Sequence, residues 1–281
     1  MKSIREAVEL YFYHIKKNKL LMFANIWVSI IVVMSFFPFL IAPYDPNRVF
    51  SGKAGMAPSL DFLMGTDHVG RDIFSQIVWG TRTSLMIACG AIVIELLIAL
   101  PIGLFAGYFG GYIDQLLMRI SDAVLTLPTI VLLIVAVTLL RAQSLLSIIL
   151  VMGFINWPWL AKIIRGESLR VREEDFVIAA KAMGFSDMYI IFKHILPNIT
   201  SPIIVVLTFD AAWFILYEAT ISFIGLGNPT IPSWGRLLYI GRGFLSSYPW
   251  ISIFPGVFIF LTVLSLNIIG DALSDLLAIK V

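Results

Sequence analysis

Long apolar runs alternate with short polar connections along this chain. The first run, residues 20–44, contains no Asp, Glu, Lys or Arg. It is longer than the apolar region of a signal peptide, about 7–15 residues, so we expect a retained helix. A helix that crosses a bilayer needs about 20 consecutive, mostly apolar residues. The pattern predicts an all-α polytopic membrane protein with six transmembrane helices, at residues 20–42, 83–107, 115–140, 143–162, 199–224 and 250–272.

Composition supports a membrane protein. Of the 281 residues, 59% are hydrophobic and 14% are charged, and the mean hydropathy is +0.93. Soluble domains average about 45–50% apolar and about 25% charged residues. The net charge of +2 and the isoelectric point of 8.6 give no indication of a nucleic-acid-binding surface. The bilayer is therefore the expected environment, and nucleic acid is not an expected partner.

The distribution of Lys and Arg predicts the orientation in the membrane. With the N-terminus inside, 13 of the 20 basic residues fall on the side of the termini, and cytoplasmic flanks carry such an excess. We expect both termini in the cytoplasm, with an N-terminal segment at 1–19, an extracytoplasmic connection at 43–82 and a tail at 276–281. The N-terminal segment either lies along the membrane as an amphipathic helix or serves only as a basic flank.

The longest cytoplasmic connection, residues 163–198, has an unusually apolar interior for a loop in water. Acidic residues at 173–175 suit the start of a helix, and Gly184 suits the left-handed residue after its end. Ser186 can cap a second helix, which Pro197 is expected to close. The pattern predicts two helices joined by a sharp corner. Their apolar face is covered either by a partner protein or by the chain's own helices.

This connection contains the stretch VIAAKAMGFSDMYIIFKHILPN, which is similar to the EAA loop of ABC importer permeases. That loop has the pattern Glu-Ala-Ala, three residues, Gly, nine residues and Ile-x-Leu-Pro. Ile178 stands where the family often has Glu, and His194 where it has Ile. The form from His194 to Asn198 resembles the peptide and nickel branch. The resemblance implies that the loop docks on a cytoplasmic ATPase through Ala179, Ala180, Met183, Gly184, Phe185, Ser186, His194 and Pro197.

The connection between the first two spans carries a second resemblance. Asp72 can cap a helix that lies at the membrane edge and enters the second span at Thr81. The preceding residues resemble the Gly-Thr-Asp-x-x-Gly-Arg-Asp motif of peptide-type permeases. The resemblance extends to GYFGGYID, SFIGLGNPTIPSWG and NIIGDALSD further along the chain. It implies contact with a solute-binding protein, or a role in a gate, for Asp67, Arg71, Asp72 and Trp234. No metal site is expected, because His68 has no second His at ligand spacing.

Charged residues inside predicted spans are candidates for function, because charge is costly within a bilayer. The six candidates are Glu95, Arg119, Asp122, Asp210, Glu218 and Asp271. Arg119 and Asp122 are three residues apart and are expected to pair with each other. Asp210 and Glu218 lie on nearly the same helix face and either line a watery cavity or meet a partner subunit. Asp271 is expected to meet Lys or Arg of the long cytoplasmic connection.

Together these features resemble permease subunits of peptide- and nickel-type ABC importers, with the type I permease fold. The five-helix core is expected at 83–275, with the EAA-type loop at 163–198 and an extracytoplasmic loop at 225–249. The resemblance implies a second homologous permease, two cytoplasmic ATP-binding subunits and an extracytoplasmic solute-binding protein. The chain has no phosphate-binding Gly-x-x-x-x-Gly-Lys-[Ser/Thr] loop. We therefore expect no enzyme activity and no cofactor here, with ATP and magnesium bound by partner ATPases.

The substrate class stays open between alternatives. Di- and oligopeptides are expected first, and nickel complexes or oligosaccharides are imported by similar machinery. An alternative from another functional class is a stand-alone secondary transporter that uses Glu95, Asp210 and Glu218 as an ion relay. A membrane-embedded hydrolase lacks any nucleophile or metal constellation. The expected location is the plasma (inner) membrane of a bacterium or archaeon.

Overall fold

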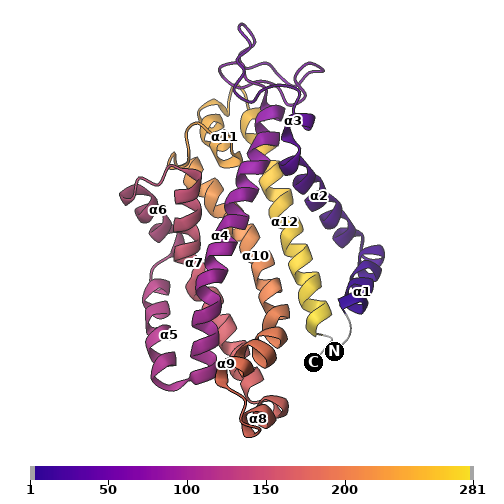
Figure 1. The fold of residues 1–281 in the computed structure, drawn as a ribbon. Helices are drawn as coiled ribbons and strands as arrows, with labels where there is room; N and C mark the ends of the chain where they lie inside the picture. Colours follow the sequence, from indigo (N-terminus) through magenta and orange to yellow (C-terminus); the bar gives the residue numbers. More distant parts are fainter. Residues whose placement is uncertain (1–3, 279–281) are drawn as a thin grey trace.

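The computed structural model describes residues 4–278, which form a bundle of α-helices without a β-strand (Figure 1). The helices are α1 (Ile4–Lys17), α2 (Lys19–Phe36), α3 (Pro38–Ile41), α4 (Ile73–Phe109), α5 (Gly111–Leu125), α6 (Thr129–Leu139), α7 (Leu145–Arg172), α8 (Asp175–Ala182), α9 (Asp187–Ile190), α10 (Leu196–Phe223), α11 (Trp234–Gly241) and α12 (Trp250–Ala278). Among the described residues, five helices are long and apolar enough to span a membrane, and the number is six if the bent pair of α5 and α6 counts as one span. The all-α architecture is confirmed.

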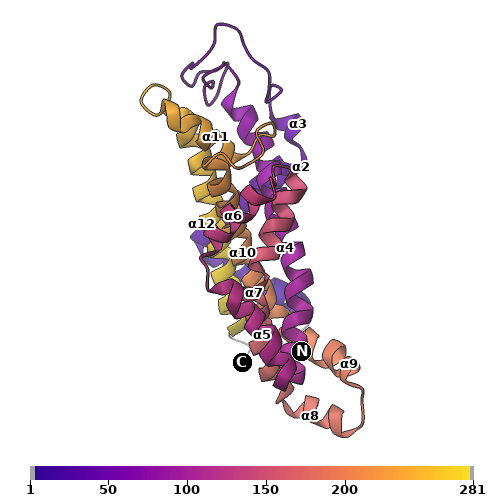
Figure 2. The ribbon, with the colours of Figure 1, turned by 90° about the vertical axis from the view of Figure 1, so that its left-hand side faces the viewer.

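The bundle has two distinct ends. In Figure 1 the loop of residues 42–72 and α11 lie at one end, which we call the outer end. Helices α8 and α9 project from the opposite end, which we call the inner end, and Figure 2 shows them standing clear of the bundle. Helix α1 and the last turns of α12 also lie at the inner end. The chain therefore crosses the bundle an even number of times.

The expected helix at 115–140 is broken. Helices α5 and α6 meet at an angle of 82° around residues 126–128. Pro128 stands at the N-cap of α6, and proline both lacks a backbone N–H and disfavours helical geometry at the residue before it. The apolar pattern continues through this point and so gave no sign of the bend.

Two further boundaries differ from the sequence prediction. Helix α4 is one continuous helix of 37 residues, so the helix expected at the membrane edge is the first part of the second span. Pro197 does not close a helix but lies in the first turn of α10, after a π-helical turn at Ile191–Ile195. In that turn the N–H of Leu196 donates to the carbonyl of Ile191. The wider turn accommodates the proline ring without ending the helical path.

Close contact between α4 and α7 forms the centre of the bundle. A Cβ atom at Gly103 would lie 2.6 Å from the carbonyl oxygen of Ala161, and one at Gly107 would lie 2.5 Å from Ser168 Cβ. Small residues four apart allow two helix backbones to approach in this way. The approach fixes α7 against the full inner half of α4.

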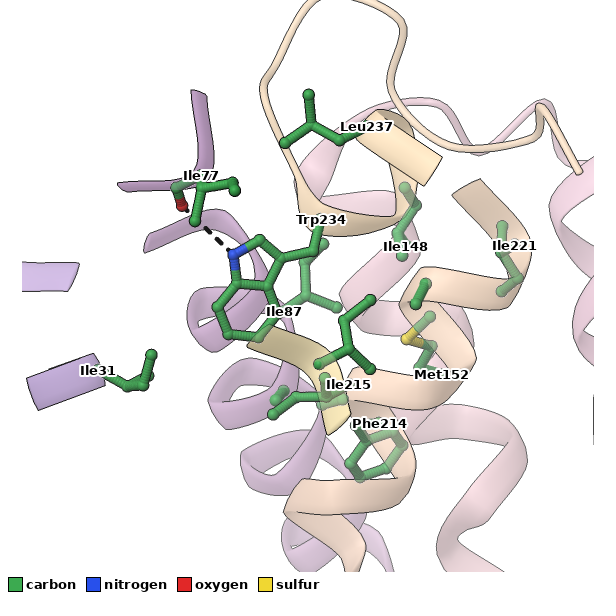
Figure 3. Packing of buried hydrophobic residues seen from close by; sticks show 14 of the residues in the cluster. Ile31, Ile77, Ile87, Ile148, Met152, Phe214, Ile215, Ile221, Trp234 and Leu237 are labelled. Atoms are coloured by element: carbon green, nitrogen blue, oxygen red, sulfur yellow. Dashed lines mark hydrogen bonds between the residues drawn. The ribbon is translucent and has the colours of Figure 1, made fainter. Parts of the chain in front are cut away.

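The buried apolar residues form two clusters, one toward each end. Trp234 is the largest fully buried side chain of the outer cluster. Its indole N–H donates to the carbonyl of Ile77 over 3.3 Å, which joins α11 to α4 (Figure 3). The inner cluster joins α4, α7 and α10 to the base of α8 and α9.

Candidate functional site

The projecting corner at the inner end is built by local sequence. We call residues 175–190, which comprise α8, Gly184 and α9, the inner corner. Gly184 has a φ of +85°, in the left-handed region. Its N–H donates to the carbonyl of Lys181 at 3.0 Å, and the N–H of Phe185 donates to the carbonyl of Ala180 at 3.3 Å. This pair of bonds is the Schellman arrangement that ends a helix at glycine.

The second half of the inner corner begins at Ser186. The Ser186 hydroxyl accepts a hydrogen bond from the N–H of Tyr189 at 3.4 Å and so caps α9. From α9 the chain continues through the π-helical turn into α10 without a break, over residues 187–223. The inner corner is therefore joined directly to the start of a membrane-spanning helix.

The inner corner has one buried face and one exposed face. Val177 and Ala180 are buried in the inner cluster and hold α8 against the bundle. The other face exposes large apolar side chains: Phe176, Ile178, Met183, Phe185, Met188 and Tyr189. Met183, at the tip, is 70% exposed. Of the two alternatives for this apolar surface, the chain's own helices cover only the Val177 and Ala180 side.

Aromatic rings give the exposed face a fixed shape. The rings of Phe185 and Tyr189 stack with centroids 4.8 Å apart. His194 lies against Tyr189 at 5.7 Å and Phe176 at 6.2 Å, and is half-buried. His194 therefore packs against two aromatic rings of the inner corner. Pro197 and Ala179 are exposed.

Polar contacts tie the inner corner to α4. The hydroxyl of Tyr108, near the end of α4, donates to the Asp187 carboxylate at 2.6 Å. The Arg172 guanidinium donates to the carbonyls of Gly107 and Tyr108, at 3.2 and 3.1 Å, and satisfies the end of that helix. Sequence reasoning missed these contacts, because nothing local to residue 108 or 172 indicates a partner so far along the chain.

The sequence-predicted outer residues are mostly internal. Asp67, Asp72 and Trp234 are buried. Asp67 accepts the N–H groups of Val69 and Arg71, at 3.0 and 2.8 Å, and shapes the turn of the outer connection. Asp72 caps α4 by accepting the N–H of Ser75 at 2.7 Å. These three side chains are buried and stabilise the outer end from within. Arg71, in contrast, is only partly buried and lines a pocket.

The charged residues of α5 pair differently from the sequence prediction. Asp122 pairs with Lys162 of α7 at 2.5 Å, not with Arg119 on its own helix. Asp114 makes a two-armed ion pair with Arg165, also on α7. Both contacts hold α5 against α7, a tertiary arrangement that spacing along one helix cannot reveal.

Three carboxyl groups are buried between α4, α7 and α10. Glu218 accepts hydrogen bonds from the hydroxyls of Ser84 and Ser222, at 3.2 and 2.8 Å. Glu95 accepts one from the Asn156 amide at 3.2 Å and lies beside Asp210. One oxygen of Glu95 and one of Asp210 are shielded from solvent and have no hydrogen-bond partner within the described part of the chain. Asp210 and Glu95 therefore lie near each other in the interior of this chain, and both are buried.

The expectation for Asp271 is wrong. Asp271 is exposed on α12, and no Lys or Arg of residues 162–198, all of which the structure describes, forms an ion pair with it. Helix α12 packs on α2 and α10 instead of beside that connection. Within residues 4–278, no group of three or more His, Cys, Asp or Glu side chains is placed to hold a metal ion.

The fold defines a polytopic helical membrane protein with an apolar corner exposed at its inner end. Residues 99–281 match the family described as "Binding-protein-dependent transport system inner membrane component", and the chain belongs to that family. It is the permease component of an ABC importer of the inner membrane. This membership decides against the stand-alone secondary transporter.

Curated relatives resemble nearly the whole chain. A dipeptide transport system permease protein of Alkalihalophilus pseudofirmus is 38% identical, over 95% of this chain and 88% of that protein. An oligopeptide transport system permease protein of Bacillus subtilis is 35% identical, over 93% of this chain and 86% of that protein. A glutathione transport system permease protein of Pectobacterium atrosepticum is 33% identical, over 98% and 92%.

A solved structure supports the fold. An inward-facing structure of the MetNI methionine ABC transporter contains a chain that aligns with a TM-score of 0.58 at 20% identity. The alignment covers 74% of this chain and 97% of that one. The chain therefore has the type I ABC importer permease fold.

Proposed function

We propose that the inner corner docks on a cytoplasmic ATP-binding subunit and transmits its motion to the membrane. The observation that carries this proposal is the exposed apolar face from Phe176 to Tyr189 at an end that faces water. Large apolar patches on surfaces exposed to water mark sites of protein contact. The rigid Gly184 turn and the aromatic stack give this face a fixed shape that a partner groove can recognise.

The path of the coupled motion follows from the contacts of the corner. When ATP closes the two ATPase subunits, the docked corner moves with them. Helix α9 continues into α10, and Asp187 is tied to Tyr108 of α4. Both helices are long and apolar enough to span the membrane, and they pack against each other. The displacement therefore changes their tilt and switches the opening of the pathway, which this chain forms with a second, similar permease.

The chain itself acts without enzymatic chemistry. ATP and magnesium belong to the partner ATPases, and an extracytoplasmic solute-binding protein delivers the substrate to the outer end. Both termini are cytoplasmic in this proposal. The placement of α1 and the end of α12 at the same end of the bundle as the inner corner supports that orientation (Figure 1).

Di- and oligopeptides are the proposed substrates. The names of the relatives from Alkalihalophilus pseudofirmus and Bacillus subtilis support a peptide. Nickel complexes and oligosaccharides are the alternatives. Uptake of a labelled dipeptide in the presence of unlabelled peptide, nickel complex or oligosaccharide separates them, because only the true substrate class competes.

The docking proposal is tested by affinity capture of the chain from its native membrane. Met183→Glu places a charge at the exposed tip and should abolish recovery of the ATP-binding subunits. Leu60→Glu is the matched control, because Leu60 is 98% exposed at the outer end. Equal recovery of ATPases with both variants would contradict the proposal.

A further inference from the structure

A polar pocket opens at the outer end, between the connection that precedes α4 and the segment that follows α10. Its volume is about 340 Å³, and its polar lining includes His68, Arg71, Asn228 and Arg236. Known small-molecule sites have volumes of about 300–1,000 Å³. Both guanidinium groups keep their positive charge in a protein.

The two guanidinium groups lack a full counter-charge. Neither Arg71 nor Arg236 forms an ion pair with a carboxylate in the part of the chain that the structure describes. Asp67 is the nearby acid, but its Oδ1 accepts two backbone N–H groups and its Oδ2 accepts the Gln76 amide at 3.3 Å. Asp67 is thus committed to the outer connection, and its charge offsets only one of the two cations.

Two further observations favour an anion as the ligand of this pocket. The Nε of Arg71 and the Nδ1 of His68 are shielded from solvent and have no hydrogen-bond partner among the described residues. Burial, together with the neighbouring Arg71 guanidinium, lowers the pKa of Arg236, and Asp67 acts in the opposite direction. The two cations therefore repel each other across a partly buried pocket.

The walls of the pocket are preformed. The ring of His68 stacks on Phe244 with centroids 4.8 Å apart. The Asn228 side chain accepts the N–H groups of Thr230 and Ile231, at 2.8 and 3.0 Å, and fixes the loop after α10. A ligand can therefore bind without the loss of conformational entropy that ordering these walls would cost.

We propose that this pocket binds a carboxylate, held between the guanidinium groups of Arg71 and Arg236. Guanidinium forks match the planar geometry of a carboxylate. Two cations beside one acid leave a net charge of about +1, which suits a singly charged carboxylate better than a doubly charged phosphate. The carboxylate comes either from the C-terminus of a peptide or from an acidic side chain of the docked binding protein. The choice between these two sources rests on the proposed function, whereas the proposal that the pocket binds a carboxylate does not.

Chemical protection of the arginines tests the proposal on the complete transporter in lipid nanodiscs. Phenylglyoxal, a guanidinium reagent, is added and modification at each arginine is read by mass spectrometry. N-acetyl-alanyl-alanine should protect Arg71 and Arg236, whereas its C-terminal amide should not. Arg48, which lies in the same connection but outside the pocket, is the internal control. Its modification should stay unchanged.

A second arm identifies the source of the carboxylate. The purified solute-binding protein replaces the small probe, alone and after loading with peptide. Protection by the binding protein but not by the free probe assigns the carboxylate to the docking surface, and protection by the free probe assigns it to the cargo. If neither protects, or if acid and amide protect equally, the pocket is not a carboxylate site.

The variant Arg236→Gln gives an independent check. It removes one of two charged donors. The concentration of N-acetyl-alanyl-alanine that halves the modification of Arg71 should rise about tenfold, because the loss of one hydrogen bond between charged groups weakens binding by about that factor. Arg236→Lys should restore part of the loss, and Arg48→Gln should have no effect. An unchanged value for Arg236→Gln would overturn the proposal. Protection needs no ATPase activity, so failure of the coupling proposal would leave this result intact.

Discussion

The hydroxyl of Tyr108 donates a 2.6 Å hydrogen bond to the carboxylate of Asp187, across 79 residues of sequence. Tyr108 is 6% exposed near the end of α4, and Asp187 is the first residue of α9. The bond connects the inner corner to the second spanning helix by a route other than the backbone.

Loss of this bond should loosen coupling without loss of the fold. Tyr108→Phe keeps the ring and removes the donor, at a cost of about 1.5–3 kcal/mol for a hydrogen bond to a charged group. We expect less substrate transported per ATP hydrolysed, measured in proteoliposomes of the whole transporter. Tyr112→Phe is the control, because Tyr112 is 91% exposed. Unchanged stoichiometry in Tyr108→Phe would show that α10 alone carries the motion.

The Gly184 turn should depend on backbone conformation and not on space. A Cβ at Gly184 meets nothing within 4 Å, but its φ of +85° is unfavourable for most side chains. Gly184→Val should abolish coupled ATP hydrolysis and transport, because a left-handed conformation costs an L-residue roughly 1–2 kcal/mol and a β-branched one more. Gly184→Asn should retain most activity, since Asn tolerates that region. Equal activity of both variants would mean that the turn is not required.

The glycines of α4 should be required for assembly of the bundle. Gly103→Leu introduces a Cβ 2.6 Å from the Ala161 carbonyl oxygen. Overpacking of this kind costs about 1–3 kcal/mol, so the midpoint of thermal unfolding in detergent should fall. Gly166→Leu on α7 is the matched control, because nothing lies within 4 Å of its Cβ. A fall of equal size in both variants would argue against a close α4–α7 contact.

The buried carboxyl groups should respond to amide substitution in opposite ways. Glu95→Gln keeps the bond from Asn156 and gives Asp210 a donor, so it should raise stability by about 1–3 kcal/mol. In Glu218→Gln one oxygen that accepts a serine hydroxyl becomes an NH₂ group, so stability should fall. Thermal unfolding of the purified protein measures both. Shifts in the same direction would contradict this arrangement of partners.

Local sequence was sufficient to predict the inner corner. Gly184 and the Ser186 cap act on backbone atoms within a few residues, so their effect can be predicted from the local sequence. The break at Pro128 escaped prediction, because the apolar run continues on both sides of it. Pro197 was misread as a helix end because the π-helical turn that accommodates it has no sequence signal.

Contacts between helices were beyond the reach of sequence spacing. Asp122 has Arg119 three residues away on its own helix, yet it pairs with Lys162 because α5 packs against α7. Asp67 was expected to contact a solute-binding protein or to act in a gate, but its carboxylate accepts backbone N–H groups of the connection itself, whereas the predicted Asp72 cap is confirmed at the start of α4. A motif alone cannot show whether its polar atoms form hydrogen bonds within the chain or contact a partner.

Site-specific cross-linking at the tip of the inner corner is the most direct test of docking on an ATPase. The chain has a single cysteine, Cys89, so Met183→Cys in a Cys89→Ser background places one reactive thiol at the corner. In native membranes this thiol should cross-link to an ATP-binding subunit, and Leu60→Cys at the outer end should not. Absence of that product from Met183→Cys, or its appearance from Leu60→Cys, would contradict the account.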